Sequence, residues 1–153
     1  PGCLTSGNIS WVAGAVYSFE VGGLTACTQY DQISVVGTVN LGNGTLEATP
    51  YGGFAPSVDN VFTIISNDGT DAISGTFNNL TEGSQFTQNG VTYRISYVGG
   101  DGNDVTLTVQ NVPAVPDTGF ALLTSNSLYT IVTATIAAGM LVVIARRLQK
   151  NQA

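Results

Sequence analysis

The 153-residue sequence contains no histidine, and residues 1–114 contain no lysine. Without histidine there is no Ser/His/Asp or Cys/His catalytic set and no imidazole ligand for a metal ion. A Gly-rich phosphate-binding turn between a strand and a helix is also missing. We therefore do not expect an enzyme, and we expect no cofactor.

Charge is scarce and unevenly placed. Charged residues make up 9% of the chain, against roughly 25% in an ordinary soluble domain. Residues 1–114 carry one basic residue, Arg94, and nine acidic ones: Glu20, Asp31, Glu47, Asp59, Asp68, Asp71, Glu82, Asp101 and Asp104. An acidic domain repels nucleic acid, which is therefore not expected as a partner. Low charge with abundant Gly, Asn, Thr and Ser favours extended β structure on a cell surface.

Only two cysteines are present, Cys3 and Cys27. In an exported protein they could pair as a disulfide, and the alternative is two unpaired small side chains. The sequence leaves both open. It has no CxxC, so metal binding by this pair is not expected.

Alternating apolar and polar residues predict an all-β domain over residues 1–110. The clearest strand is 91–98, in which Val91, Tyr93, Ile95 and Tyr97 share one face, and the alternation resumes at 105–109. Further strands are predicted at 15–21, 32–36, 38–41, 45–48, 61–66 and 73–77. Gly and Asn-Gly turns separate them. Two architectures fit: the terminal part of a parallel β-solenoid, or an antiparallel β-sandwich. No clear internal repeat decides between them.

Five segments carry a resemblance to a known family, namely 30–35 (YDQISV), 37–41 (GTVNL), 62–69 (FTIISNDG), 74–77 (SGTF) and 97–107 (YVGGDGNDVTL). Together they are similar to the C-terminal part of large bacterial surface proteins built from autotransporter-associated β-strand repeats. The resemblance covers about residues 15–110. It implies a right-handed parallel β-helix that ends near Val109, and it favours the solenoid.

The turn at 99–104 also matches the first six positions of the Gly-Gly-x-Gly-x-Asp-x-U-x calcium repeat. Thr106 stands where the repeat requires a large apolar residue, and only one copy is present. The favoured interpretation is a tight turn before a strand, with no metal. The alternative is a calcium site that uses Asp101, Asn103 and Asp104.

A Pro-containing linker, 111–119, follows the β domain and ends in a second recognisable motif. The motif resembles the Leu-Pro-x-Thr-Gly signal of Gram-positive sortase substrates, with valine in place of leucine. Its residues are Val115, Pro116, Asp117, Thr118 and Gly119. The resemblance implies that a sortase cleaves between Thr118 and Gly119 and transfers the chain to peptidoglycan or another cell-wall amine.

Residues 120–145 predict a transmembrane helix. The uncharged core, 128–145, spans roughly 27 Å as a helix, close to a hydrocarbon thickness of about 30 Å. A buried core helix is the alternative. The tail 146–153 carries three basic residues, Arg146, Arg147 and Lys150, which place it in the cytoplasm and the N-terminus outside. The chain begins without Met or a signal peptide, so we expect a longer exported precursor.

These features predict a protein of the Gram-positive cell surface. We expect the C-terminal region of a structural stalk or adhesin, with a sortase, a cell-wall amine and the membrane as partners, and an unknown surface ligand. The alternative is an uncleaved single-pass membrane protein whose β domain binds a ligand itself. The lack of lysine in 1–114 disfavours a polymerising pilin, which needs a lysine amine to receive the next subunit.

Overall fold

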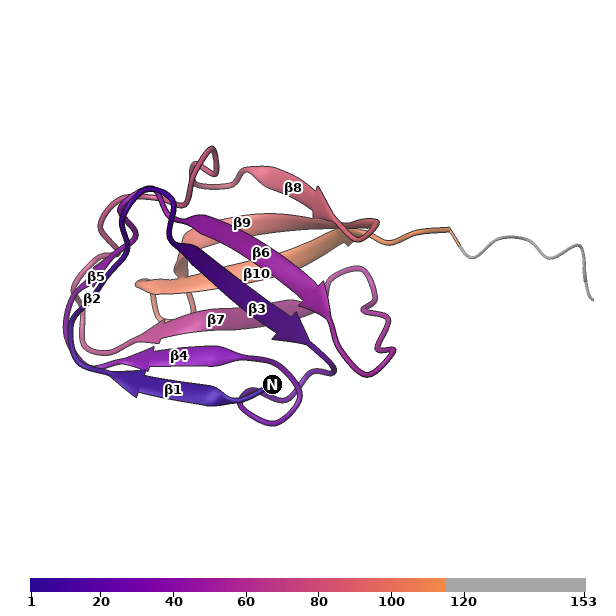
Figure 1. Ribbon diagram of the computed structural model, residues 1–153, viewed down its shortest axis with the longest axis horizontal. Coiled ribbons are helices and arrows are strands. Elements are labelled where there is room, and N and C mark those ends of the chain that lie inside the picture. Colours follow the sequence, from indigo (N-terminus) through magenta and orange to yellow (C-terminus); the bar gives the residue numbers. More distant parts are fainter. Residues whose placement is uncertain (115–153) are drawn as a thin grey trace, which may run out of the picture. The chain divides into compact units, whose positions relative to one another are not determined.

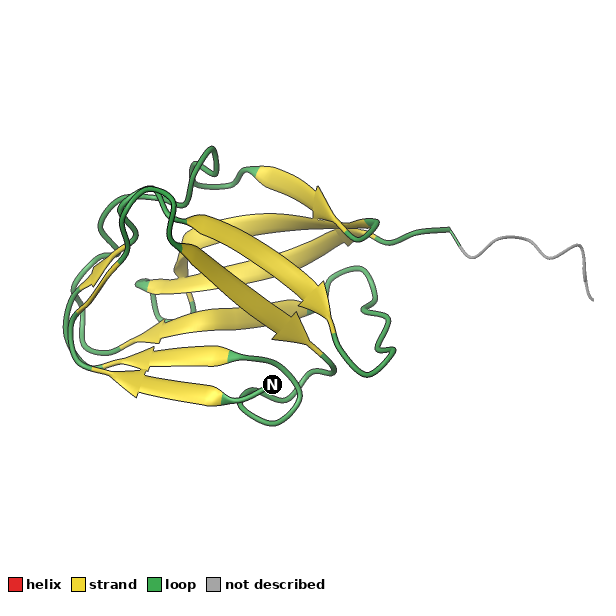
Figure 2. Ribbon diagram, in the orientation of Figure 1, coloured by secondary structure: helices red, strands yellow, loops and turns green. Residues whose placement is uncertain are grey.

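The computed structural model describes residues 1–114, in which it has strands and no helix (Figure 2). The all-β prediction is confirmed for this part of the chain. The strands are β1 (Cys3–Ser6), β2 (Ile9–Ser10), β3 (Val16–Val21), β4 (Gln32–Val35), β5 (Val39–Asn40), β6 (Thr45–Pro50), β7 (Val61–Asn67), β8 (Gln85–Gln88), β9 (Val91–Gly99) and β10 (Asp104–Asn111).

The first half of the domain consists of two circuits of the chain laid one on the other. The first circuit is β1–β2–β3 and the second is β4–β5–β6, and each strand pairs in parallel with its counterpart (Figure 1). Leu4 lies opposite Ile33 and Tyr17 opposite Leu46, in each case 29 residues apart. β7 continues the first ladder by pairing in parallel with β4.

After β7 the pairing changes to antiparallel. β10 pairs with β7, β9 with β10, and β8 with β9, which gives one six-stranded sheet in the order β1-β4-β7-β10-β9-β8. Figure 1 shows this sheet with β3 and β6 crossing in front of it. Because the sheet is mixed, neither of the predicted architectures, a parallel β-helix or an antiparallel sandwich, describes the whole domain.

The core lies between these layers and is rich in aromatic side chains. Phe19 of β3 and Phe62 of β7 have ring centroids 5.8 Å apart, and Tyr30 contacts Phe62 edge-on at 5.3 Å. A second aromatic pair links the residue after β2 to the core: the ring centroids of Trp11 and Tyr17 are 5.9 Å apart. Such pairs add to the stability that comes from burying the rings.

The predicted alternation of β9 is confirmed, since Val91, Tyr93, Ile95 and Tyr97 are all buried. In β10, Val105, Leu107 and Val109 are buried as expected, but Thr106 is buried as well. A Cβ added at Gly99 would lie 2.3 Å from Thr106 Cγ2. The side chain of Thr106 therefore occupies the space left by the missing side chain of Gly99.

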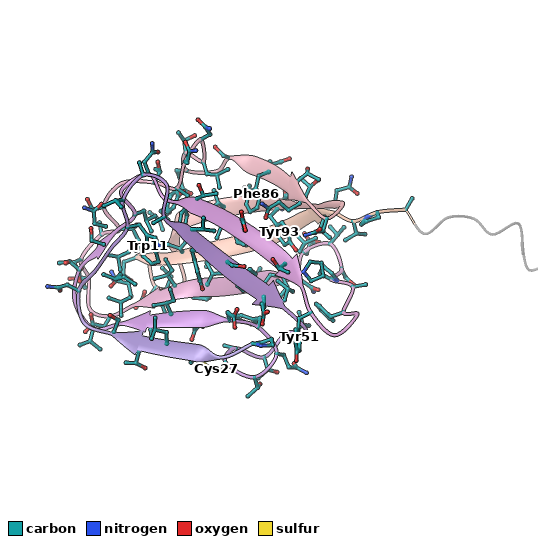
Figure 3. All side chains as sticks on the ribbon, in the orientation of Figure 1. Trp11, Cys27, Tyr51, Phe86 and Tyr93 are labelled. Carbon is teal, nitrogen blue, oxygen red and sulfur yellow. A yellow bond between two sulfur atoms is a disulfide. The ribbon has the colours of Figure 1, made fainter. Side chains whose placement is uncertain are left out.

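The strand predicted at 73–77 is wrong. This segment makes only isolated bridges, Asn40 with Ser74 and Phe77 with Leu80, because Gly75 has φ +73° and breaks the extended backbone. Three strands were not predicted. β1 and β2 precede residue 11, and β8 lacks a clear apolar alternation. β8 is held to β9 in part by Phe86, whose ring stacks on Tyr93 at 5.5 Å (Figure 3).

Candidate functional site

Most of the predicted site residues lie outside the described residues. These are the sorting motif (Val115, Pro116, Asp117, Thr118 and Gly119), the helix 120–145 and the basic residues Arg146, Arg147 and Lys150. Within residues 1–114, no helix is long and apolar enough to cross a membrane. The structure therefore bears on the β domain, where three features stand out: an open end, a capped end and a buried polar cluster.

The outer side of the first circuit is the open end. The backbone of β1 bonds to β4 through the carbonyls of Gly2 and Ser6, which accept from Gln32 N (3.1 Å) and Val36 N (2.9 Å). Backbone groups alternate in direction along a strand, so the N–H and C=O of Thr5 point away from β4. No strand among residues 1–114 pairs with that edge of β1 or of β2. Their outward backbone groups remain available for pairing.

At the open end the core-facing Leu4 of β1 is uncovered, whereas Tyr17, Phe19 and Val21 of β3 are buried. In the ladder Leu4–Ile33–Ile65, formed by β1, β4 and β7, the exposed fraction of the residue falls from 57% to 6% to 0%. A hollow of about 500 Å³ lies beside this edge, lined by Leu4, Ile9, Trp11 and Ile33 among others. Leu4 of the first circuit is thus exposed at a position where the second circuit has a buried apolar residue, Ile33.

A loop covers one corner of the open end. Residues 29–31 pair with the outer edge of β3, through Asp31 N donating to Glu20 O (3.0 Å) and Gly22 N donating to Gln29 O (2.6 Å). A disulfide joins Cys27 of this loop to Cys3 of β1, with their Cα atoms 4.5 Å apart. The pairing that the sequence left open is therefore made, and it ties β1 to the loop.

The opposite side of the second circuit is the capped end. Side-chain amides take the place of a strand along β6: Asn89 Nδ2 donates to Ala48 O (2.9 Å), and Gln88 Oε1 accepts from Ala48 N. β5 is covered by Ser74, which exchanges backbone hydrogen bonds with Val39 and Leu41. β10 covers the remaining edge of β7. Every ladder of the second circuit therefore ends on another part of the chain.

The buried polar cluster consists of Asn67, Asn103 and Asp104. Asn103 and Asp104 were candidates from the sequence and are buried, whereas the third candidate, Asp101, is exposed. Asn103 Nδ2 donates to the carbonyls of Asp68 (3.1 Å), Gly69 (3.4 Å) and Asp71 (3.3 Å). Asp104 Oδ1 accepts from the backbone N of Asn67 (2.9 Å). Sequence reasoning missed Asn67; the signal was its position at the start of an Asn-Asp-Gly turn.

Oxygen atoms dominate this cluster. Asn67 and Asn103 are each 4% exposed, and neither Oδ1 accepts a hydrogen bond from any described group of the protein. Burial raises the pKa of Asp104 and the charge of Asp101 raises it further, while the hydrogen bond from Asn67 N opposes both. Among residues 1–114, no three His, Cys, Asp or Glu side chains are placed to hold a metal ion. A metal site in this cluster would therefore have to include the amide oxygens of Asn67 and Asn103 among its ligands.

The chain matches no protein-family model, and neither curated proteins nor solved structures gave a match.

Proposed function

We propose that residues 1–114 are the terminal part of a bacterial surface stalk, attached to the cell wall by a sortase acting at Thr118–Gly119. In this proposal the two circuits are the last coils of a right-handed parallel β-helix that displays an upstream region. The observation that carries the proposal is the difference between the two ends of the ladders, one open and one capped.

The open end supports stacking of a preceding coil. Parallel ladders gain stability when each strand has a neighbour on both edges, and apolar side chains gain about 25 cal/mol per Å² when covered. At the open end β1 has an unpaired edge, and Leu4 is 57% exposed above a buried Ile33. A coil set on the first circuit would pair with Thr5 and cover Leu4, as the first circuit covers Ile33 of the second.

The capped end supports a terminal position for these two circuits, at the side where the described chain ends. A Cβ added at Gly90 would lie 2.7 Å from Pro113 Cγ, so the chain leaves the domain next to the turn whose Asn89 caps β6. The sorting motif begins two residues later, at Val115. Growth of the ladders would therefore proceed away from the point at which the chain leaves the domain, near Pro113.

The attachment step is an acyl transfer. A sortase thiolate attacks the Thr118 carbonyl carbon, the bond to Gly119 N breaks, and that nitrogen leaves as an amine after taking up a proton. A cell-wall amine then attacks the resulting thioester, which forms an amide and releases the thiolate. Pro116 would bend the peptide in the enzyme groove, and Gly119 has no side chain to obstruct the nucleophile.

Sorting is tested with a purified sortase, the chain and a short glycine peptide as the amine. The expected product ends at Thr118, carries the glycine peptide and lacks residues 119–153, as measured by intact mass. Thr118→Ala should give no product. Val115→Leu restores the usual first residue and should react at least as fast. If Val115→Leu reacts and the native chain does not, the native protein is an uncleaved anchor.

Stacking is tested with a chain in which residues 3–31 are duplicated in tandem. The added circuit should dock on the original one and slow hydrogen exchange at the amide of the original Thr5. Thr5→Pro at that position removes the outward N–H; it should block docking but leave the unduplicated chain folded, because Pro is tolerated on an open edge. If the amide of the original Thr5 exchanges at the same rate with and without the added circuit, the circuits do not stack and the proposed stalk is refuted.

The second candidate is a ligand-binding module, and exposed apolar residues in the loop between β6 and β7 favour it. Tyr51 and Val58 are 53% and 47% exposed there, and Figure 3 shows Tyr51 at the edge of the domain. Deleting residues 1–110 from the surface protein separates the two functions. Adhesion that persists identifies a spacer, and adhesion that disappears identifies this domain as the binder.

A further inference from the structure

We propose that the buried polar cluster of Asn67, Asn103 and Asp104 binds a calcium ion between the turns 67–71 and 100–104. Two unpartnered amide oxygens and one carboxylate come from residues that are each at least 91% buried. Calcium is the common biological cation that prefers six to eight oxygen ligands, with carboxylates and Asn carbonyls among them.

Hydrogen bonding fixes which atom of each amide is free. The Nδ2 atoms of Asn67 and Asn103 both donate to Asp71 O, at 2.8 and 3.3 Å. Turning either amide over would set its oxygen against that carbonyl oxygen. The Oδ1 atoms must therefore stay on the other side of the amides, unpaired by the protein, although a buried acceptor left unmatched costs about 1–3 kcal/mol.

The charges around the cluster also point to a cation. Asp101 and Asp104 lie in one turn, Asp68 and Asp71 in the other, and residues 1–114 contain no lysine. Arg94, the one arginine among residues 1–114, is exposed on β9, where its neighbours across the strands are Gln85 and Thr108. The described residues thus supply no positive side chain to this region. A bound cation would supply the missing positive charge.

The site differs from the one that the sequence motif suggests. Calcium repeats of that motif need stacked copies to complete the coordination, and this chain has one. Here Asn67, at the start of the turn after β7, supplies a ligand that the motif does not include. Asp101 is exposed, so it contributes negative charge near the ion but is not a buried ligand.

Calorimetric titration of the chelator-treated chain with Ca²⁺ tests the proposal directly. We expect one ion per chain and an increase in Tm of several degrees with excess Ca²⁺. Asp104→Asn keeps an oxygen to accept from Asn67 N but removes the charge. It should bind Ca²⁺ at least tenfold more weakly, and in chelator its Tm should equal or exceed that of the native chain. Glu47→Gln, an exposed carboxylate on β6, is the control and should bind as the native chain does.

Terbium luminescence gives a reading that does not depend on the variants. Sensitised emission from the native chain should appear with Tb³⁺ and disappear when Ca²⁺ is added in excess. Absence of heat, emission and Tm shift in the native chain would mean that the amide oxygens are satisfied by water, and it would overturn the proposal. An equal Tm shift in Asp104→Asn and the native chain would also overturn it, since binding would then lie elsewhere.

Discussion

Asn89 donates from its side-chain nitrogen to the backbone carbonyl of Ala48 at 2.9 Å, across 41 residues of the sequence. Together with Gln88, it gives the outer edge of β6 the partners that another strand would give. An exposed strand edge invites pairing with a further chain. The two amides therefore end the ladder of β3 and β6 without adding a strand.

Replacing Asn89 by glycine should weaken this cap without straining the turn. Asn89 has φ +51°, which glycine adopts freely, so Asn89→Gly removes the amide but keeps the backbone shape. We expect the free energy of unfolding to fall by about 1 kcal/mol beyond the cost of the matched control, Asn43→Gly. Asn43 has φ +64°, and its side chain makes no hydrogen bond within the described residues. Urea unfolding measures the difference, and equal costs would show that Asn89 does not act as a cap.

Removing the hydroxyl of Tyr97 should destabilise the junction between β9 and the segment 73–80. The hydroxyl donates to Leu80 O (2.6 Å) and accepts from Phe77 N (3.1 Å). Burial raises the pKa of Tyr97 to about 12, so it remains a donor at neutral pH. Tyr97→Phe leaves two buried backbone groups unpaired and should lower the free energy of unfolding by about 1–3 kcal/mol.

Tyr93→Phe is the control for that measurement. Tyr93 lies on the same face of β9 and is also buried, but its hydroxyl makes no hydrogen bond within residues 1–114. Its loss should change the free energy of unfolding by less than about 0.5 kcal/mol. Similar losses for the two variants would contradict a specific role for the Tyr97 hydroxyl.

The local patterns in the sequence predicted strands well because side-chain alternation depends on neighbours within a few residues. Strands β3, β4, β5, β6, β7, β9 and β10 were all predicted in this way. The two circuits were not predicted. Residues that pair between them in β3 and β6 lie 29 positions apart and can be quite different in type, as the buried pair Phe19 and Ala48 shows, so the sequence contains no visible repeat. The capping amides and the position of Asn67 depend on contacts 37 to 41 residues apart. No local pattern encodes them.

Breaking the disulfide between Cys3 and Cys27 should release the loop from β1. The two cysteines are 24 residues apart, and in the chain-entropy account closing a loop of that length destabilises the unfolded state by about 3.5 kcal/mol. The double variant Cys3→Ser, Cys27→Ser should lose up to that amount in urea unfolding. Reductant should give a similar loss in the native chain and none in the double variant. A reductant effect on the double variant would show that the loss has another source.

Truncating the three residues of the first ladder should give costs that rise toward the capped end. Ile65→Ala removes a fully buried side chain and should cost about 2–5 kcal/mol, and Ile33→Ala should fall in the lower part of that range. Leu4→Ala should cost under about 1 kcal/mol, because Leu4 is 57% exposed. In the chain with residues 3–31 duplicated, the original Leu4 should be covered and its truncation should become as costly as that of Ile33. An unchanged cost would mean that the open end of the first circuit is a finished surface, since stacking must bury this side chain.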